Sequence, residues 1–170
     1  MSAPSLQATN VDALPDVTGE EPGLWAMATE NATRYLILCQ PEGTNRAIRL
    51  SWYGLHSRWR PYACAHVETG DRFPRIPEPV RVGQMMLIRF GQSFHDYYRS
   101  GTVVSILRSD LPDALRVEEI EDLARQAMLD SAADVLVDAF RAGRIPDDQT
   151  LVETCEHGGI DPAAVKRRLA

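Results

Sequence analysis

The chain has 170 residues, 44% of them hydrophobic, and a formal net charge of −6 at pH 7. Its length is sufficient for one good core with a small satellite, and its acidic charge argues against general affinity for DNA or for an anionic membrane. Its three cysteines, an odd number, exclude a disulfide framework, and no run approaches the roughly 20 apolar residues of a membrane span. Without an export signal at its start, the chain is expected to be cytoplasmic and to have no membrane contact.

The first segment, residues 1–22, mixes Ser, Thr, Pro, Asp and Glu with only scattered Leu and Val. Such a composition offers little apolar surface to bury, and ordering the backbone is then unfavourable. We therefore expect a disordered arm over 1–22, with the ordered part of the chain beginning near Leu24.

Residues 23–108 consist of short apolar or alternating runs separated by turn residues, which is typical of an all-β domain. Strands are predicted over 34–40, 47–53, 60–67, 84–90 and 101–107. The prolines between residues 73 and 80 exclude regular strand pairing there, and residues 91–100 are expected to form a loop or a hairpin with a ragged tip. Five short strands with bent connections favour a small antiparallel β-barrel, of the SH3-like or OB-like kind.

Alternation is clearest over residues 47–53. The apolar face of this predicted strand holds Ile48, Leu50 and Trp52. The opposite face holds Arg49, Ser51 and Tyr53. We expect the apolar face to be core and the opposite face to lie on the surface.

After Asp110 the apolar residues recur at three- and four-residue spacing, which indicates helices. A first helix is expected to open near Pro112 and to end at Gly143, and two shorter helices are expected over 146–157 and 161–169. The last two helices suit either a helix-turn-helix or a helical hairpin that caps the barrel, and the short final helix favours the hairpin. Residues 112–170 thus form an acidic helical unit, and the whole chain is predicted to be α+β.

The block between Arg46 and Arg75 is the most informative part of the sequence, since it holds six arginines against two acids and interleaves them with aromatic residues. Single-strand nucleic-acid binders on small barrels combine these residue types, although arginines also protect strand edges from aggregation. Seventeen of the 18 basic residues are arginine, for which the codon usage of a GC-rich bacterial genome is the simpler explanation. The candidate binding residues are Arg49, Tyr53, Arg58, Trp59, Arg60, Tyr62 and Arg99, with Arg99 forming a second rim beside Tyr97 and Tyr98.

No motif in the sequence specifies a reaction, because the common nucleophile, zinc-protease, P-loop and dinucleotide patterns are missing. Cys64 and His66 would share one face of a strand and could both bind zinc, whereas Cys155 and His157 would point to opposite sides of a helix. No cofactor is expected. A small metal- or thiol-dependent enzyme centred on Cys64, His66 and His95 is the alternative from another functional class.

Trp59, Ala63, His66 and the segment 72–76 resemble the WYL-type barrel of bacterial regulators over about twenty residues. The resemblance implies ligand or nucleic-acid sensing. Arg-Pro follows Trp59 where that family has Tyr-Leu, and the arginine segment is shorter. The chain is therefore not assigned to this family.

The charge of the chain is asymmetric, since residues 21–110 carry eleven arginines against eight acids and residues 111–170 carry seven bases against thirteen acids. This asymmetry and the missing catalytic motifs predict a non-enzymatic bacterial binding or regulatory protein. Its arginine and aromatic barrel face would engage a protein partner or a single-stranded nucleic acid, and its helices would mediate assembly. A phage or mobile-element inhibitor that blocks a host complex is a further alternative.

Overall fold

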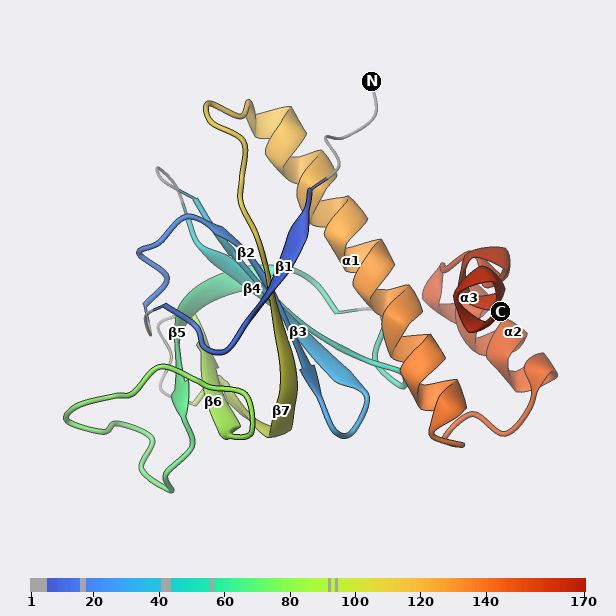
Figure 1. Cartoon of the computed structure of the whole chain (residues 1–170), viewed down its shortest axis with the longest axis horizontal. Coiled ribbons are helices and arrows are strands. Elements are labelled where there is room, and N and C mark those ends of the chain that lie inside the picture. The colour runs from blue at the N-terminus through green and yellow to red at the C-terminus, as the bar shows by residue number, and fades with distance from the viewer. Residues whose placement is uncertain (1–5, 16–17, 41–43, 56, 92, 94) are drawn as a thin grey trace.

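The computed structural model describes residues 6–15, 18–40, 44–55, 57–91, 93 and 95–170. It shows an antiparallel β-barrel followed by three helices, which confirms the α+β fold class (Figure 1). The strands are β1 (Ala8–Val11), β2 (Gly23–Thr29), β3 (Thr33–Cys39), β4 (Arg46–Ser51), β5 (Arg60–Val67), β6 (Met85–Phe90) and β7 (Tyr97–Ser109). The helices are α1 (Val117–Arg141), α2 (Asp148–Gly158) and α3 (Pro162–Leu169).

Strand β7 closes the barrel. The strands follow the order β7-β2-β3-β4-β5-β6, and β6 pairs back with β7, so six strands form a closed ring. The first half of β7 pairs with β6 from Tyr97 to Thr102, and its second half pairs with β2 from Val103 to Ser109. The short strand β1 adds to the end of β7.

The expectation of a disordered arm over residues 1–22 is corrected for the described part of that segment. Strand β1 pairs with β7 in a register that runs from Ala8 opposite Ser109 to Val11 opposite Ile106, and Leu14 is buried in the barrel core. The composition is polar because β1 is an exposed strand that is held by backbone hydrogen bonds. Residues 1–5 and 16–17 lie outside the described residues.

Four of the five predicted strands agree with β3, β4, β5 and β6 to within two residues. The fifth is longer than predicted, because β7 begins at Tyr97, inside the segment that was expected to be a loop or a ragged hairpin. Strand β2 was not predicted. Nearly all its residues are buried, so it shows no alternation of polar and apolar residues.

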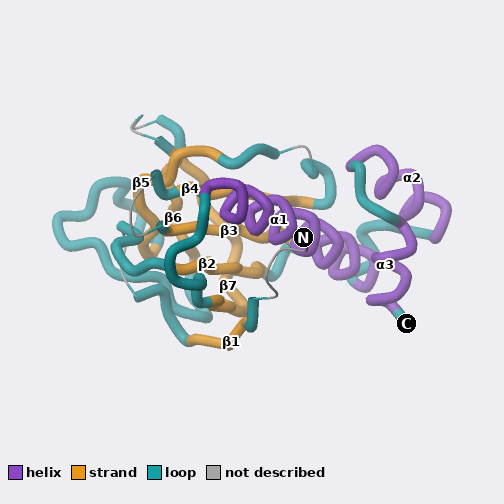
Figure 2. The backbone as a smooth tube through the Cα atoms, turned by 90° about the horizontal axis from the view of Figure 1, so that it is seen from above, coloured by secondary structure: helices purple, strands orange, loops and turns teal. Residues whose placement is uncertain are grey.

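Apolar layers lie on both sides of β3 and β4. The side chains of Tyr35, Ile37 and Ala47 belong to the core inside the barrel, whereas Ile48 and Leu50 pack outside it against α1. Helix α1 therefore covers the outer wall at β3 and β4 (Figures 1 and 2). The apolar face predicted for 47–53 is core, but it faces the helix instead of the barrel interior.

The prediction that the opposite face of β4 lies on the surface is wrong for Arg49 and Ser51. They follow Ala47 by two and four residues and thus point into the barrel, as Ala47 does. Ser51 is only 1% exposed. Of the face that was expected to be surface, only Tyr53, beyond the end of β4, is well exposed.

Helix α1 begins at Val117 and not near Pro112, because Ala114 has a φ of 55°, which no right-handed helix contains. The helix ends at Arg141, and Gly143 follows with a φ of 70°, as predicted for a helix stop.

The last two helices lie where they were predicted, but they pack on α1 instead of capping the barrel. The side chain of Asp147 accepts a hydrogen bond from the backbone of Thr150 at 2.8 Å, and that of Asp161 accepts one from the backbone of Ala163 at 2.9 Å. The pair packs on α1 and lies beyond the barrel when the molecule is seen from above (Figure 2). None of the described helices is long and apolar enough to cross a membrane.

Candidate binding site at the mouth of the barrel

One end of the barrel, where β2, β4 and β6 end and β3, β5 and β7 begin, gathers arginines and aromatic rings. Five side chains form a continuous series of contacts there, and we call them the mouth cluster. They are Tyr53, Arg49, Tyr98, Phe90 and Arg60.

Arg49 is the centre of the mouth cluster. Its guanidinium carbon lies 4.8 Å from the ring centroid of Tyr98 and 5.9 Å from that of Tyr53, and its Nη2 donates a hydrogen bond to the Tyr53 hydroxyl at 3.0 Å. Burial disfavours the charged form, but hydrogen bonds to Tyr53 and Tyr35 outweigh it, so the pKa of Arg49 is raised. The guanidinium is thus a fixed positive charge held between aromatic rings.

The pKa values of the two tyrosines that form hydrogen bonds with Arg49 shift in opposite directions. Burial raises the pKa of Tyr35 above its ordinary value of 10.0, and the hydrogen bond to Arg49 offsets only part of this. The hydrogen bond from Arg49 lowers the pKa of the exposed Tyr53 below 10.0. Tyr35 is therefore the inner, apolar wall of the site, while Tyr53 is its outer, solvated wall.

Arg60 forms the other end of the mouth cluster. Its guanidinium carbon lies 4.8 Å from the ring centroid of Phe90, and it forms an ion pair with Asp96. The Phe90 ring meets Tyr98 edge to face, with centroids 5.7 Å apart. The mouth therefore presents two arginines with one carboxylate beside them.

Three of the seven predicted binding residues meet in the mouth cluster, namely Arg49, Tyr53 and Arg60. The other four lie elsewhere. Trp59 packs on the outer side, against the core beneath α1, Tyr62 is buried inside the barrel, Arg58 is exposed on the connection before β5, and Arg99 pairs with Glu68 at 3.3 Å.

The prediction left Phe90 out of the site and named Tyr98 only as part of a second rim, beside Tyr97 and Arg99. Alternation along β7 sends Tyr97 and Arg99 to the outer face and Tyr98 to the inner one. The sequence shows two tyrosines followed by an arginine over residues 97–99, which indicated a binding surface. It does not show which of these three side chains points into the barrel, because that depends on where the alternation along the strand begins.

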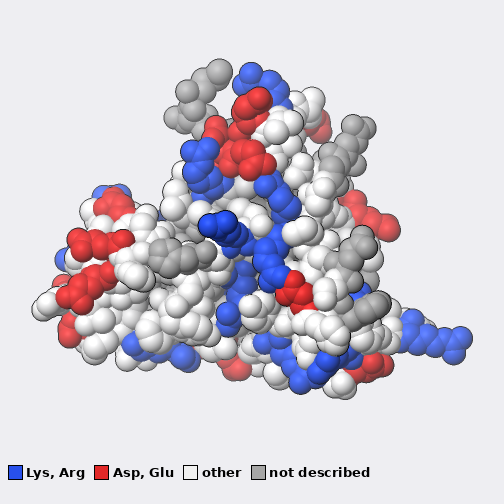
Figure 3. All heavy atoms as spheres, turned by 180° about the vertical axis from the view of Figure 1, so that it is seen from behind, with Lys and Arg blue, Asp and Glu red and all other residues white. Residues whose placement is uncertain are grey.

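A second arginine and aromatic layer lies on the outer wall of β6 and β7. Arg72 stacks over Tyr97 with its guanidinium carbon 4.5 Å from the ring centroid, and Arg89 stacks over Phe73 at 5.2 Å. From behind, basic side chains form a band down the middle of the molecule, while acidic side chains gather on the side of α2 and α3 (Figure 3). The charge asymmetry of the sequence is thus also an asymmetry of the surface.

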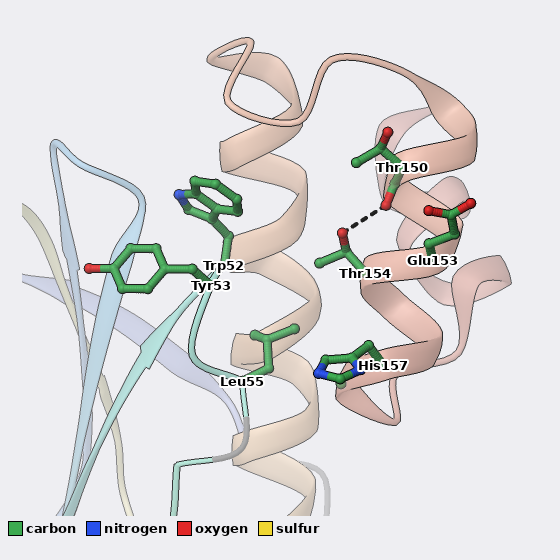
Figure 4. Close-up of a pocket in the computed structure, with 8 residues that line it drawn as sticks. Trp52, Tyr53, Leu55, Thr150, Glu153, Thr154 and His157 are labelled. Carbon is green, nitrogen blue, oxygen red and sulfur yellow. Dashed lines mark hydrogen bonds between the residues drawn. The ribbon is translucent and has the colours of Figure 1, made fainter.

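A groove of about 440 Å³ adjoins the mouth at Tyr53. One wall is the connection after β4, and the other is α2, whose Thr154 hydroxyl donates to the Thr150 carbonyl at 2.7 Å (Figure 4). The lining residues are Trp52, Tyr53, Leu55, Thr150, Glu153, Thr154, His157 and Gly158, and this set is what we call the groove. Its barrel wall is aromatic and apolar, and its helix wall is polar and carries Glu153.

The residues of the alternative enzyme site are held by protein contacts. Both Cys64 and His66 are buried. The Cys64 sulfur accepts a hydrogen bond from Arg89 Nε at 3.2 Å, and His66 Nδ1 lies 2.9 Å from the Val67 carbonyl oxygen. His95 is exposed. In the part of the chain that the structure describes, no three His, Cys, Asp or Glu residues are grouped so as to hold a metal ion.

In chemical terms, the mouth cluster offers fixed guanidinium groups and aromatic faces, which suit carboxylate, phosphate or ring-bearing ligands. The groove beside it offers apolar contact and one carboxylate. No protein-family model, curated protein or solved structure matches the chain.

Proposed function

We propose that this protein is a non-enzymatic binding protein whose mouth cluster holds an acidic segment of a protein partner. The observation that carries the proposal is the alternation of two arginines with three aromatic rings at one end of the barrel. Because the rings hold the guanidinium groups in place, a carboxylate can pair with them at little cost in side-chain entropy. Tyr53 and Tyr98 are 67% and 39% exposed, so both rings also offer contact area.

The surroundings of the mouth favour an acidic peptide segment over a nucleic acid. A nucleic-acid strand carries a phosphate at every nucleotide and needs a basic path along its length. Beyond Tyr53 the groove instead presents the carboxylate of Glu153, and Arg60 already pairs with the carboxylate of Asp96. A short acidic segment can end at the mouth, whereas a long polyanion would extend past the mouth and be repelled by the carboxylate of Glu153.

A single-stranded nucleic acid is the second candidate, and one observation favours it. The two exposed tyrosines of the mouth cluster alternate with arginines, as in proteins that stack unpaired bases on aromatic rings. The same experiment tests both ligands.

The test compares two fluorescent probes on the full chain: short peptides with Asp or Glu between apolar residues, and a single-stranded oligonucleotide of mixed sequence. Fluorescence anisotropy measures the dissociation constants at low and at moderate salt. Arg49→Gln and Arg60→Gln should each weaken peptide binding about tenfold or more, since a hydrogen bond to a charged group contributes about 1.5–3 kcal/mol.

Arg125→Gln is the matched control, because Arg125 is exposed on α1 and pairs with Asp122 away from the mouth. It removes the same charge and should leave binding unchanged. Tighter binding of the oligonucleotide, lost in Arg49→Gln and in Arg58→Ala with Arg60→Ala, would assign the mouth to nucleic acid. No binding of either probe, or equal loss in all variants, would overturn the assignment of the mouth as a binding site.

A further inference from the structure

The connection between β5 and β6, residues 68–84, is long and contains no helix or strand. Most hairpin connections have about two to five residues, and long ordered connections usually carry a function. This one extends from the barrel as a separate lobe (Figure 1). We call its outer part, residues 71–79, the finger.

The base of the finger is fixed to the barrel. Val80 is completely buried in the barrel core. The backbone of Val67 donates to the Glu78 carbonyl at 3.0 Å, and the backbone of Leu14 donates to the Val80 carbonyl at 2.9 Å. The finger is therefore a supported segment.

The near side of the finger is fixed as well. The Asp71 side chain accepts from the Phe73 backbone at 2.8 Å, and the stacking of Arg72 on Tyr97 and of Arg89 on Phe73 holds this side against β6 and β7. The finger is thus largely preorganised, so a partner that binds it has little conformational entropy to remove.

The tip of the finger is apolar and exposed. Ile76 is 80% exposed and Phe73 is 49% exposed. Pro74 and Pro77 follow them directly, and a proline restricts both itself and the preceding residue to extended conformations. Arg75 is exposed beside Ile76, and among the described residues no carboxylate pairs with it.

The groove has the complementary chemistry. Extended proline-containing segments bind to grooves lined by aromatic side chains, and the barrel wall of the groove provides Trp52, Tyr53 and Leu55. The helix wall provides Glu153 at a position to meet an arginine that flanks the apolar tip. The finger and α2 also lie on opposite sides of the molecule, so the finger of one copy cannot reach its own groove (Figure 1).

We propose that the groove of one copy receives the finger of a second copy, with Ile76 and Pro77 against Trp52 and Leu55 and with Arg75 paired to Glu153. Finger and groove are different surfaces, so the contact is heterologous and joins copies head to tail into rings or open chains. The inference develops the assembly role expected of the helices and does not depend on the ligand of the mouth cluster.

The test uses two variants of the full chain that each lose one half of the contact. Ile76→Ser removes the tip of the finger, and Glu153→Lys reverses the charge of the groove wall. Analytical ultracentrifugation should show concentration-dependent oligomers for the natural sequence and at least a tenfold weaker association for each variant. A 1:1 mixture of the two variants should form a dimer and nothing larger, because only one finger and one groove remain intact.

Controls separate this proposal from a general loss of solubility and from the proposed function. Val117→Ser removes a 71% exposed aliphatic side chain at the start of α1 and should leave association unchanged. If the natural sequence stays monomeric at high concentration, or if the mixture does no better than either variant alone, the proposal is wrong. Loss of association in Arg49→Gln but not in Ile76→Ser would place the interface at the mouth instead.

Discussion

The guanidinium carbon of Arg49 lies 4.8 Å from the ring centroid of Tyr98, although these residues belong to β4 and β7, which are not neighbours in the sheet. The contact spans the open end of the barrel and joins two walls that share no backbone hydrogen bonds. The contact therefore fixes the position of the β4 side chains of the mouth cluster relative to those of β7.

Replacing Tyr98 should test how much this contact stabilises the barrel. Tyr98→Leu removes both the stacking on Arg49 and the edge-to-face contact with Phe90, and should cost about 1 kcal/mol. For a protein of this size the loss corresponds to a fall in melting temperature of about 2–4 °C. Tyr98→Phe keeps the ring and should change little, so equal effects of the two variants in a thermal melt would contradict a role for the ring.

The pKa of Tyr53 gives a spectroscopic test of its bond to Arg49. Because the folded pKa lies below 10.0, Tyr53 should lose its proton before an unperturbed tyrosine when the pH is raised. Its contribution to stability is present above pH 10 and is lost as the pH falls through its folded pKa. The buried Tyr35, whose pKa is raised, contributes stability below pH 10 that is lost as the pH rises through its folded pKa.

Ultraviolet absorbance of the phenolates during an alkaline titration measures these steps. Tyr53→Phe should remove the earliest step, and Arg49→Gln should shift that step to higher pH. If Arg49→Gln leaves the earliest step in place, the hydrogen bond does not determine the pKa of Tyr53.

A cluster of charges around Asp134 of α1 joins this helix to β3 and to α3. Arg34 of β3 lies 3.4 Å from Asp134, and Arg168 of α3 lies 3.3 Å from it. Burial raises the pKa of Asp134 despite both arginines. Its contribution to stability is therefore fully present below the ordinary value of 3.8 and is lost as the pH rises through its folded pKa.

Asp134→Asn should flatten that part of the pH dependence, as measured by urea unfolding at a series of pH values. Arg168→Gln should raise the pKa of Asp134 further and widen the pH window in which stability falls. Asp122→Asn, at an exposed α1 carboxylate, provides the matched control. A stability profile that Asp134→Asn does not alter would show that burial of this carboxylate has no energetic effect.

The contact between Leu55 and Gly158 should be sensitive to one methyl group. A Cβ at Gly158 would lie 2.6 Å from Leu55 Cδ1, closer than real contacts allow. Gly158→Ala should destabilise the protein by about 1–3 kcal/mol through overpacking, less whatever the helix gains from alanine. Leu55→Ala removes the closest atom and leaves the Cβ of residue 55 at 3.1 Å from the new methyl group, so most of the overlap is relieved. A double-mutant cycle should therefore show a favourable coupling of about 0.5–3 kcal/mol. Simple additivity would indicate that α2 moves away freely.

The barrel and the helices could be predicted from the sequence because periodicity and capping are local. Asp161 followed by Pro162 marks the start of α3, and Gly143 marks the end of α1, whatever the rest of the chain does. Strand β2 could not be predicted in this way, since a strand that is buried on both faces shows no alternation of polar and apolar residues.

The candidate site could be predicted only in part, because alternation separates two faces without saying which one turns inward. Along β4 the apolar face is core as predicted, but this core lies beneath α1 outside the barrel, and Arg49 on the opposite face points into the barrel. The contact of Arg49 with Tyr98 links residues from separate strands, and no local spacing encodes it. Tyr62, chosen for its neighbours in the sequence, is buried because the inner face of β5 includes it.

Strand β7 also determines the order in which the chain can fold. Strands β1 and β2 are synthesised before β7, but the β7 residues that pair with them lie between Val103 and Ser109. Pairing over so long a separation requires closure of a large loop, which slows folding. Until β7 has been made, one edge of β2 has no native partner strand, so the growing chain depends on its most distant strand to protect its first ones from aggregation.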